Sequence, residues 1–178
     1  MQGSAGLDWL HRYRDMAALT VRRSATLPPA YLEQDSPLTL AEGLAEYYRV
    51  NGERVSPPQS LPPESAELFR RHDICHVIFG LDTTLADEAV VDTRTLVSCD
   101  VGFRRYARYL ASDAEAKAVF RETGYGVVAW ATLKAIPRIA CAAIAAFRMK
   151  KRWPWDPPDE YRSRTLADLR REYGIRIV

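Results

Sequence analysis

Cysteine is scarce in this sequence: only Cys75, Cys99 and Cys141 occur among 178 residues, and no two of them form a Cys-x-x-Cys pair. An odd, scattered set argues against a disulfide framework or a thiolate zinc site, and it predicts reduced, intracellular thiols. A large charge of one sign is also absent. With 25 Lys and Arg against 23 Asp and Glu, the net charge of +2 predicts no binding to nucleic acid. Because Asp8 and His11 interrupt the N-terminal apolar residues, we expect no cleavable signal sequence.

The length suits a single domain over residues 1–178, with enough chain to bury a hydrophobic core. No segment alternates apolar and polar residues as a half-buried strand would, whereas apolar residues recur at helical spacing in several segments. We therefore predict an all-α fold, a single-domain helical bundle. Helices are expected over residues 7–21, 40–50, 64–79, 85–97, 113–122, 126–147 and 166–173.

Several of these boundaries depend on local signals. The segments Thr39–Glu42 and Thr84–Asp87 have the form of capping boxes, in which a threonine at the helix start precedes an acid by three residues. Gly80 and Gly174 follow segments with a helical pattern, and we expect them to end the helices before them.

Residues 126–147 are the most apolar part of the chain and are long enough to span a bilayer. However, Lys134, Pro137 and Arg138 lie near the middle of this segment. A charge at the centre of a span costs about 2.5–3.5 kcal/mol on insertion scales. We therefore predict a core helix or a membrane-contacting helix, bent at Pro137, in preference to a transmembrane span.

Histidine is as scarce as cysteine, yet two of the three histidines lie four residues apart, at His72 and His76. On a helix this spacing places both imidazoles on one face, one above the other, where they can bind a single ion. The helix around them is apolar on almost all sides, and two histidines are hard to bury there for packing alone. We interpret the pair as metal ligands, although a single histidine on such a face is more often a hydrogen-bonded core residue.

Two residues flank this face at nearly equal angles, Asp73 on one side and Cys75 on the other. The geometry of the helix does not choose between them. A carboxylate suits harder ions and also zinc, whereas a thiolate favours zinc or another soft ion. On these grounds both remain candidates.

A further ligand is expected from the next helix. Glu88 follows soon after the tight connection formed by residues 80–83. Two helices joined so closely pack as an antiparallel hairpin, which brings the start of the second back toward the end of the first. Asp82, Asp87 and Asp92 are rival acids, and Asp87 is expected to serve the N-terminus of its own helix.

This pattern resembles the metal-binding signature of the coenzyme Q biosynthesis protein 4 family. The shared string is His72-Asp73-x-x-His76, then eleven residues, then Glu88. The flanking residues are also similar, namely Leu44-Ala45-Glu46-Tyr47-Tyr48, Asn51-Gly52, Ser56-Pro57, Arg70-Arg71 and His76-Val77-x-x-x-Gly80. The resemblance covers about residues 40–90. After Glu88 the segment Val90–Thr95 departs from the family pattern, so the chain resembles a divergent member.

The resemblance implies an all-helical protein that binds a divalent ion, usually zinc, with magnesium as an alternative. It implies His72, Asp73, His76 and Glu88 as the metal ligands. The expected bound molecule is a polyprenyl lipid or quinone precursor, and the expected partners are other enzymes of ubiquinone-type quinone biosynthesis. The activity it suggests is metal-dependent decarboxylation of the ring. A cytoplasmic location peripheral to the inner face of a membrane is expected, and a homodimer is compatible with it.

The apolar segment and the residues after it fit a lipid-binding role. Small side chains such as Ala142 could leave room for an isoprenoid tail, and the basic residues with tryptophans over 148–155 suit a membrane interface. A core helix followed by a solvated charged segment explains the same residues. Two other functions fit the site: a lipid-binding scaffold with a structural metal, or a His-Asp phosphohydrolase, for which His11 is the only upstream histidine.

Overall fold

The computed structural model describes residues 27–52, 55, 63–106 and 125–178, and within these ranges the all-α fold is confirmed. The elements are η1 (Ala30–Leu32), α2 (Leu40–Asn51), α3 (Pro63–Phe79), α4 (Leu85–Ser98), α7 (Tyr125–Phe147), η3 (Asp159–Ser163) and α8 (Leu166–Tyr173), where η marks a short 3-10 turn. Only isolated bridges, and no strand, occur in the described ranges. Each of these α-helices lies within one residue of its predicted bounds, and residues 103–106, for which no helix was predicted, are also helical. The helices predicted over 7–21 and 113–122 lie outside the described residues.

Threonine caps explain where three of these helices begin. The side chain of Thr39 accepts a hydrogen bond from the backbone N–H of Glu42, and the Glu42 carboxylate accepts one from the backbone N–H of Thr39. The predicted capping box is therefore confirmed. Thr84 accepts from the backbone N–H of Asp87 at the start of α4. Thr165 caps α8 in the same way.

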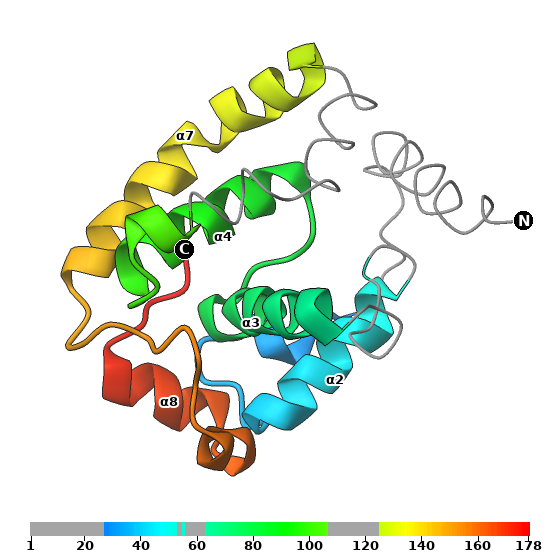
Figure 1. The fold of residues 1–178 in the computed structure, drawn as a ribbon, viewed down its shortest axis with the longest axis vertical. Helices are drawn as coiled ribbons and strands as arrows, with labels where there is room; N and C mark the ends of the chain where they lie inside the picture. Colours follow the sequence, from blue (N-terminus) through cyan, green and yellow to red (C-terminus); the bar gives the residue numbers. More distant parts are fainter. Residues whose placement is uncertain (1–26, 53–54, 56–62, 107–124) are drawn as a thin grey trace, which may run out of the picture.

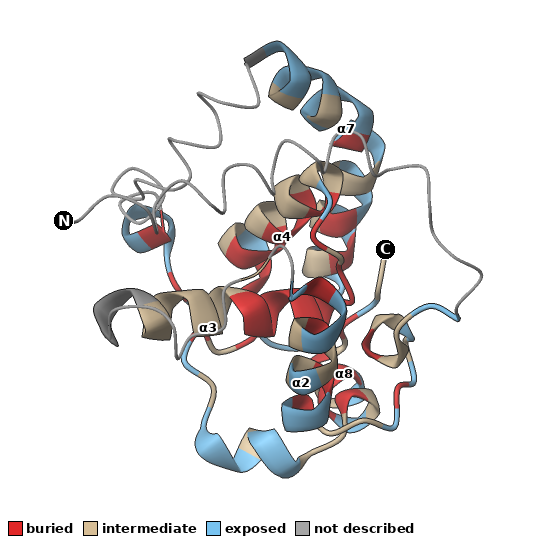
Figure 2. Cartoon of the chain, turned by 90° about the vertical axis from the view of Figure 1, so that its right-hand side faces the viewer, coloured by how far each residue is buried: buried red, intermediate tan, exposed pale blue. Residues whose placement is uncertain are grey.

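Helix α3 lies at the centre of the fold (Figure 1). Helices α2 and α8 pack against it on one side, while α4 lies on the other and packs along α7. Buried residues concentrate on α3 and α4, whereas much of α7 is exposed (Figure 2). The short connection of residues 80–84 joins α3 directly to α4, so the two helices that carry the predicted ligands are neighbours.

A buried arginine holds the C-terminal helix against α3. The Nε of Arg170 donates to the carbonyl of Ile78 at 3.0 Å. Its Nη2 donates to the carbonyls of Val77 and Tyr31, both at 2.7 Å. Two of these carbonyls lie in the last turn of α3, where the helix dipole favours a cation. Burial lowers the pKa of Arg170 to about 10, so the guanidinium stays charged at neutral pH and anchors the end of α3 just after His76.

Gly80 turns the chain away from the end of α3. Its φ is 66°, in the left-handed region that favours glycine, and Gly174 ends α8 with a φ of 70°. A Cβ on Gly80 would also lie 2.5 Å from Cδ1 of Ile177. Both the backbone conformation and the close approach of the C-terminal segment therefore require glycine at this predicted helix end.

Helix α7 continues through Pro137 and has two different sides. Ala135, Ala142 and Ala145 are buried, and their small side chains let α7 approach α4 closely. Ala142 therefore belongs to a packed interface and does not leave room for a lipid tail. Only 11% of the most apolar window of α7 is buried, so α7 is not a core helix. Among the described helices, α7 is the one that is long and apolar enough to cross a membrane.

Candidate metal centre

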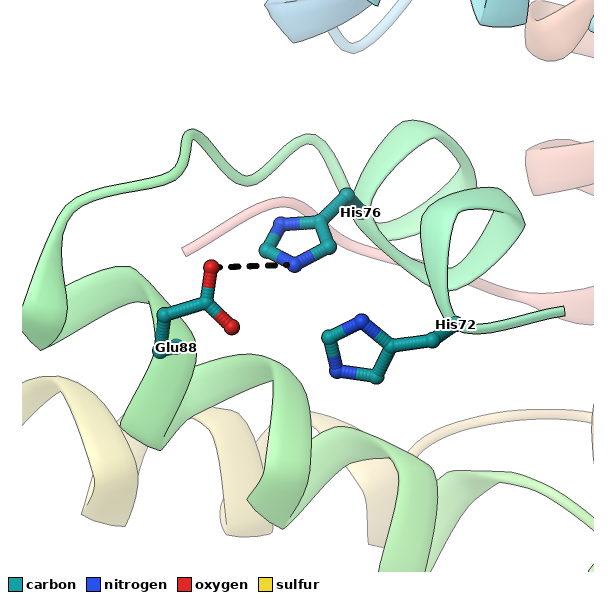
Figure 3. A group of neighbouring side chains, drawn as sticks. All are labelled: His72, His76 and Glu88. Carbon is teal, nitrogen blue, oxygen red and sulfur yellow. Dashed lines mark ion pairs between the residues drawn. The ribbon is translucent and has the colours of Figure 1, made fainter. Parts of the chain in front are cut away.

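Three side chains converge between α3 and α4 (Figure 3). His72 and His76 lie on successive turns of α3, with their ring centroids 4.9 Å apart. Glu88 points toward them from the first turn of α4. One potential ligand atom from each residue lies within 4.8 Å of the other two. Small side-chain adjustments would allow all three to bind one ion, whose bonds to nitrogen and oxygen are about 2.0–2.2 Å for zinc.

Each histidine also faces an acid on α4. The Nε2 of His76 is 3.5 Å from Oε1 of Glu88, and the Nε2 of His72 is 3.7 Å from Oδ1 of Asp92. Glu88 and Asp92 are four residues apart, so α4 presents two carboxylates at the same spacing as the two imidazoles on α3. Asp92 therefore lies beside the group of His72, His76 and Glu88 and pairs with His72.

The imidazoles of α3 are more deeply buried than the carboxylates of α4. The side chains of His76 and His72 are 1% and 14% exposed. Those of Glu88 and Asp92 are 29% and 38% exposed. The carboxylates are therefore partly open to solvent, while protein surrounds the imidazoles.

Without an ion, the charges of the site favour protonated histidines. Burial alone would lower the pKa of His72, but the carboxylates of Asp92 and Glu88 outweigh it and raise the pKa to about 9. For His76, burial is again outweighed, by Glu88, and the pKa is raised. Burial would raise the pKa values of Glu88 and Asp92, but the histidines lower both of them. A metal ion must therefore displace protons from the imidazoles when it binds.

Neighbouring aromatic residues hold the site in place. The hydroxyl of Tyr106 donates to Oδ1 of Asp92 at 2.5 Å and so fixes the carboxylate that faces His72. The ring of Tyr47 stacks on His76 with centroids 5.4 Å apart. The Nδ1 of His76 is buried without a hydrogen-bond partner in the described part of the chain. Stacking on Tyr47 therefore orients the His76 ring, whereas an acceptor for the other ring N–H orients most histidines that bind a metal.

Asp73, the fourth predicted ligand, contacts a different helix. Its Oδ2 accepts a hydrogen bond from the hydroxyl of Tyr48 at 2.8 Å, and its Oδ1 accepts one from Tyr47 at 3.3 Å. These bonds join α3 to α2. Burial raises the pKa of Asp73. The structure thus brings together the other three predicted ligands and leaves Asp73 outside the group.

The remaining candidates take other positions. The Sγ of Cys75 is 3.9 Å from the Sγ of Cys99, and both thiols are buried and free. Asp87 serves the N-terminus of α4 as expected, and it also pairs with an arginine of α7 at 2.6 Å. Asp92 was a rival of Glu88 in the sequence, but in the structure the two acids lie together at the site. His11 lies outside the described residues.

No protein-family model matches the sequence, and neither a curated protein nor a solved structure matches it significantly. The interpretation of the site therefore depends on its own geometry and chemistry. The resemblance to the coenzyme Q biosynthesis protein 4 family, which depends on the spacing of His72, Asp73, His76 and Glu88, stays a proposal.

Proposed function

We propose that this chain binds a divalent metal ion through His72, His76 and Glu88, with Asp92 as an additional ligand. The observation that carries the proposal is the convergence of the first three ligand atoms within 4.8 Å. Two separate ion pairs would also explain the carboxylates. However, two protonated imidazoles with centroids 4.9 Å apart repel each other, whereas a single metal ion replaces both protons.

The donor set favours zinc. Zinc accepts imidazole nitrogens and carboxylate oxygens together, usually in a tetrahedral arrangement. Magnesium prefers oxygen ligands and water, so the two buried imidazoles suit it less well. Four protein ligands would close the site and make the ion structural. An ion held by the two histidines and Glu88 alone would keep a position for a ligand oxygen on the exposed side, near Asp92.

We further propose that the site serves ubiquinone-type quinone biosynthesis, with a prenylated quinone precursor as its ligand. Contacts between residues that carry the resemblance support this role. Tyr47 and Tyr48 belong to the similar segment on α2, and both donate to Asp73, which belongs to the signature on α3. Residues that are similar to the family in separate parts of the sequence therefore contact one another beside the metal centre, where Tyr47 also stacks on His76.

In this role the ion would polarise an oxygen of the ring carboxyl group and so assist its removal. The chain itself would hold the ion and bury one side of it behind His76. A scaffold role with a structural metal is the second candidate, and the presence of four nearby donors favours it. The localisation proposed with either role is cytoplasmic, at the inner face of a membrane, and the apolar α7 supports it.

Zinc titration in competition with a chromophoric chelator tests the ligand set. Asp92→Asn should weaken zinc binding by about tenfold or more. Asp73→Asn should keep the affinity of the wild type and lower the stability, because its carboxylate accepts hydrogen bonds from Tyr47 and Tyr48 of α2. If Asp73→Asn weakens zinc binding and Asp92→Asn does not, Asp92 is not a ligand. That result would support the ligand set that the resemblance implies.

Organic extraction and mass spectrometry test the ligand class. Wild-type protein from a host that makes quinones should retain a prenylated quinone or its aromatic precursor, and His76→Ala should retain less of it. If zinc binds but no such lipid is retained, and added prenylated quinones do not raise the melting temperature, the quinone role is wrong and the metal site stands alone.

A further inference from the structure

The side of α7 that faces away from α4 is a continuous apolar surface, here called the outer face. Trp130, Leu133, Ile136, Ile144 and Phe147 are all more than half exposed, and Phe147 is 90% exposed. At about 100° per residue they occupy roughly a third of the helix circumference. Figure 2 shows the exposed side of this helix. Single exposed apolar residues are normal, but a contiguous stripe marks a surface that contacts another molecule.

Positive charge accompanies the outer face, and no negative charge interrupts it. The sequence has no acidic residue between Glu122 and Asp156. The ammonium of Lys134 lies 5.2 Å from the ring centroid of Trp130. Four basic residues follow the C-terminal end of α7, namely Arg148, Lys150, Lys151 and Arg152. The outer face therefore combines apolar side chains with cations, as a membrane-surface helix does.

Two of these four cations have no acidic partner among the described residues. Lys151 pairs with an acid of α8 at 2.5 Å, and Lys150 donates to a backbone carbonyl at 3.0 Å. The guanidinium groups of Arg148 and Arg152 form no ion pair with the part of the chain that the structure describes. A pocket of about 230 Å³ lies at the same end of α7, where residues of α4 line it together with Phe147, Lys151 and Arg152. It is smaller than the pockets that enclose whole ligands, and its size suits a charged headgroup.

We infer that the outer face of α7 binds the surface of an anionic lipid bilayer, with the helix axis in the plane of the membrane. The apolar side chains enter the boundary between headgroups and acyl chains, and Arg148 and Arg152 bind lipid phosphates. The helix does not span the bilayer, because its other side packs on α4 and Arg138 pairs there with Asp87 at 2.6 Å. This interaction assigns a surface to the membrane localisation proposed above, and it does not require the ion, since the metal site lies on α3 and α4.

A second copy of the chain is the competing occupant of the outer face. A two-fold interface there would join two surfaces that both lack acidic residues and carry the same free arginines. Like charges across an interface oppose association unless acids pair with them. An anionic bilayer supplies the negative charge that the outer face lacks, so charge complementarity favours the membrane.

Sedimentation of the full chain with lipid vesicles tests the inference. The wild type should bind vesicles that contain phosphatidylglycerol in phosphatidylcholine, and should bind pure phosphatidylcholine much more weakly. Replacing Arg148 and Arg152 together by Gln should weaken binding to the anionic vesicles by roughly thirtyfold. Phe147→Ser should weaken it by about tenfold, because one large apolar side chain no longer enters the lipid.

Matched variants separate the outer face from general effects of charge and hydrophobicity. Arg49→Gln with Arg162→Gln makes the same change in net charge on α2 and η3, and Leu27→Ser removes an apolar side chain that is exposed elsewhere. These variants should bind vesicles as the wild type does. So should His76→Ala, which separates a failure of the metal site from a failure of this surface. Three results would overturn the inference: no wild-type binding to anionic vesicles, equal losses in both arginine pairs, or a stable dimer in light scattering that Phe147→Ser dissociates.

Discussion

The metal-free protein should lose stability as the pH rises from about 6 to about 10. Burial alone would lower the pKa of His72, but Asp92 and Glu88 raise it to about 9 in the folded chain, whereas an unfolded histidine titrates near 6.5. A group whose pKa is raised by folding stabilises the folded state fully below the unfolded pKa. This contribution is lost as the pH rises through the folded pKa.

The size of the loss follows from the two pKa values of His72. The difference between 6.5 and about 9 is about 2.5 pKa units, and at about 1.36 kcal/mol for each the loss is about 3 kcal/mol. Asp92 is 38% exposed, so solvent screens its interaction with His72 in part. The pKa of His76 is shifted in the same direction. Glu88 and Asp92 have lowered pKa values, so their contributions are lost only at acidic pH, below this range.

Urea denaturation of chelator-treated protein at several pH values measures this dependence, and His72→Gln should remove most of it. Added zinc should act in the opposite direction, because it binds neutral imidazoles and so stabilises the protein more as the pH rises. Unperturbed histidines would release zinc near pH 6, and the raised pKa of His72 moves that release to higher pH. A metal-free stability that is constant or increases over this range would refute the reasoning.

Three further predictions concern the fold. Gly80→Ala should lower the free energy of unfolding by about 1–3 kcal/mol, because alanine is strained at a φ of 66° and its methyl group would contact the C-terminal segment. The control variant Gly126→Ala on exposed α7 should not destabilise the protein. Arg170→Met should cost about 3–5 kcal/mol in urea denaturation, because it leaves buried carbonyls without donors, and exposed Arg171→Met should cost less than about 1 kcal/mol. Cys141 alone should react with a thiol reagent before unfolding, and fast reaction of a buried thiol would contradict the described packing.

The helix boundaries were predictable because the signals that set them are local. A threonine cap, a glycine with a left-handed backbone and the spacing of apolar residues each act within one or two turns. The common face of His72 and His76 is likewise a property of one helix, and it is confirmed. The caps at Thr39 and Thr84 could be identified for the same reason.

The rest of the site depends on contacts between helices, which local patterns do not determine. The rotation of α4 about its own axis decides whether Glu88 alone, or Glu88 with Asp92, faces the histidines. Asp73 contacts α2 because that helix presents Tyr47 and Tyr48 to its side of α3. No spacing within a single helix could have predicted that contact.

Buried Arg170 and exposed α7 illustrate the same limit. An arginine in a charged C-terminal helix is typical of a solvated position, yet Arg170 is buried because carbonyls of α3 and η1 surround its guanidinium. The composition of residues 126–147 allows a core helix, a membrane-contacting helix or a span. In the structure α4 packs along one side of α7 and the other side is exposed. The composition of the segment does not predict this arrangement.

Zinc content after extensive dialysis tests the central claim most directly. Wild-type protein loaded with zinc should retain about one ion per chain. His76→Ala and Glu88→Gln, each shown to be folded by circular dichroism, should retain almost none. Cys75→Ser should match the wild type, because its sulfur faces Cys99 and not the site. Equal zinc in the wild type and in both folded ligand variants, or no zinc in any of them, would contradict the proposed metal centre.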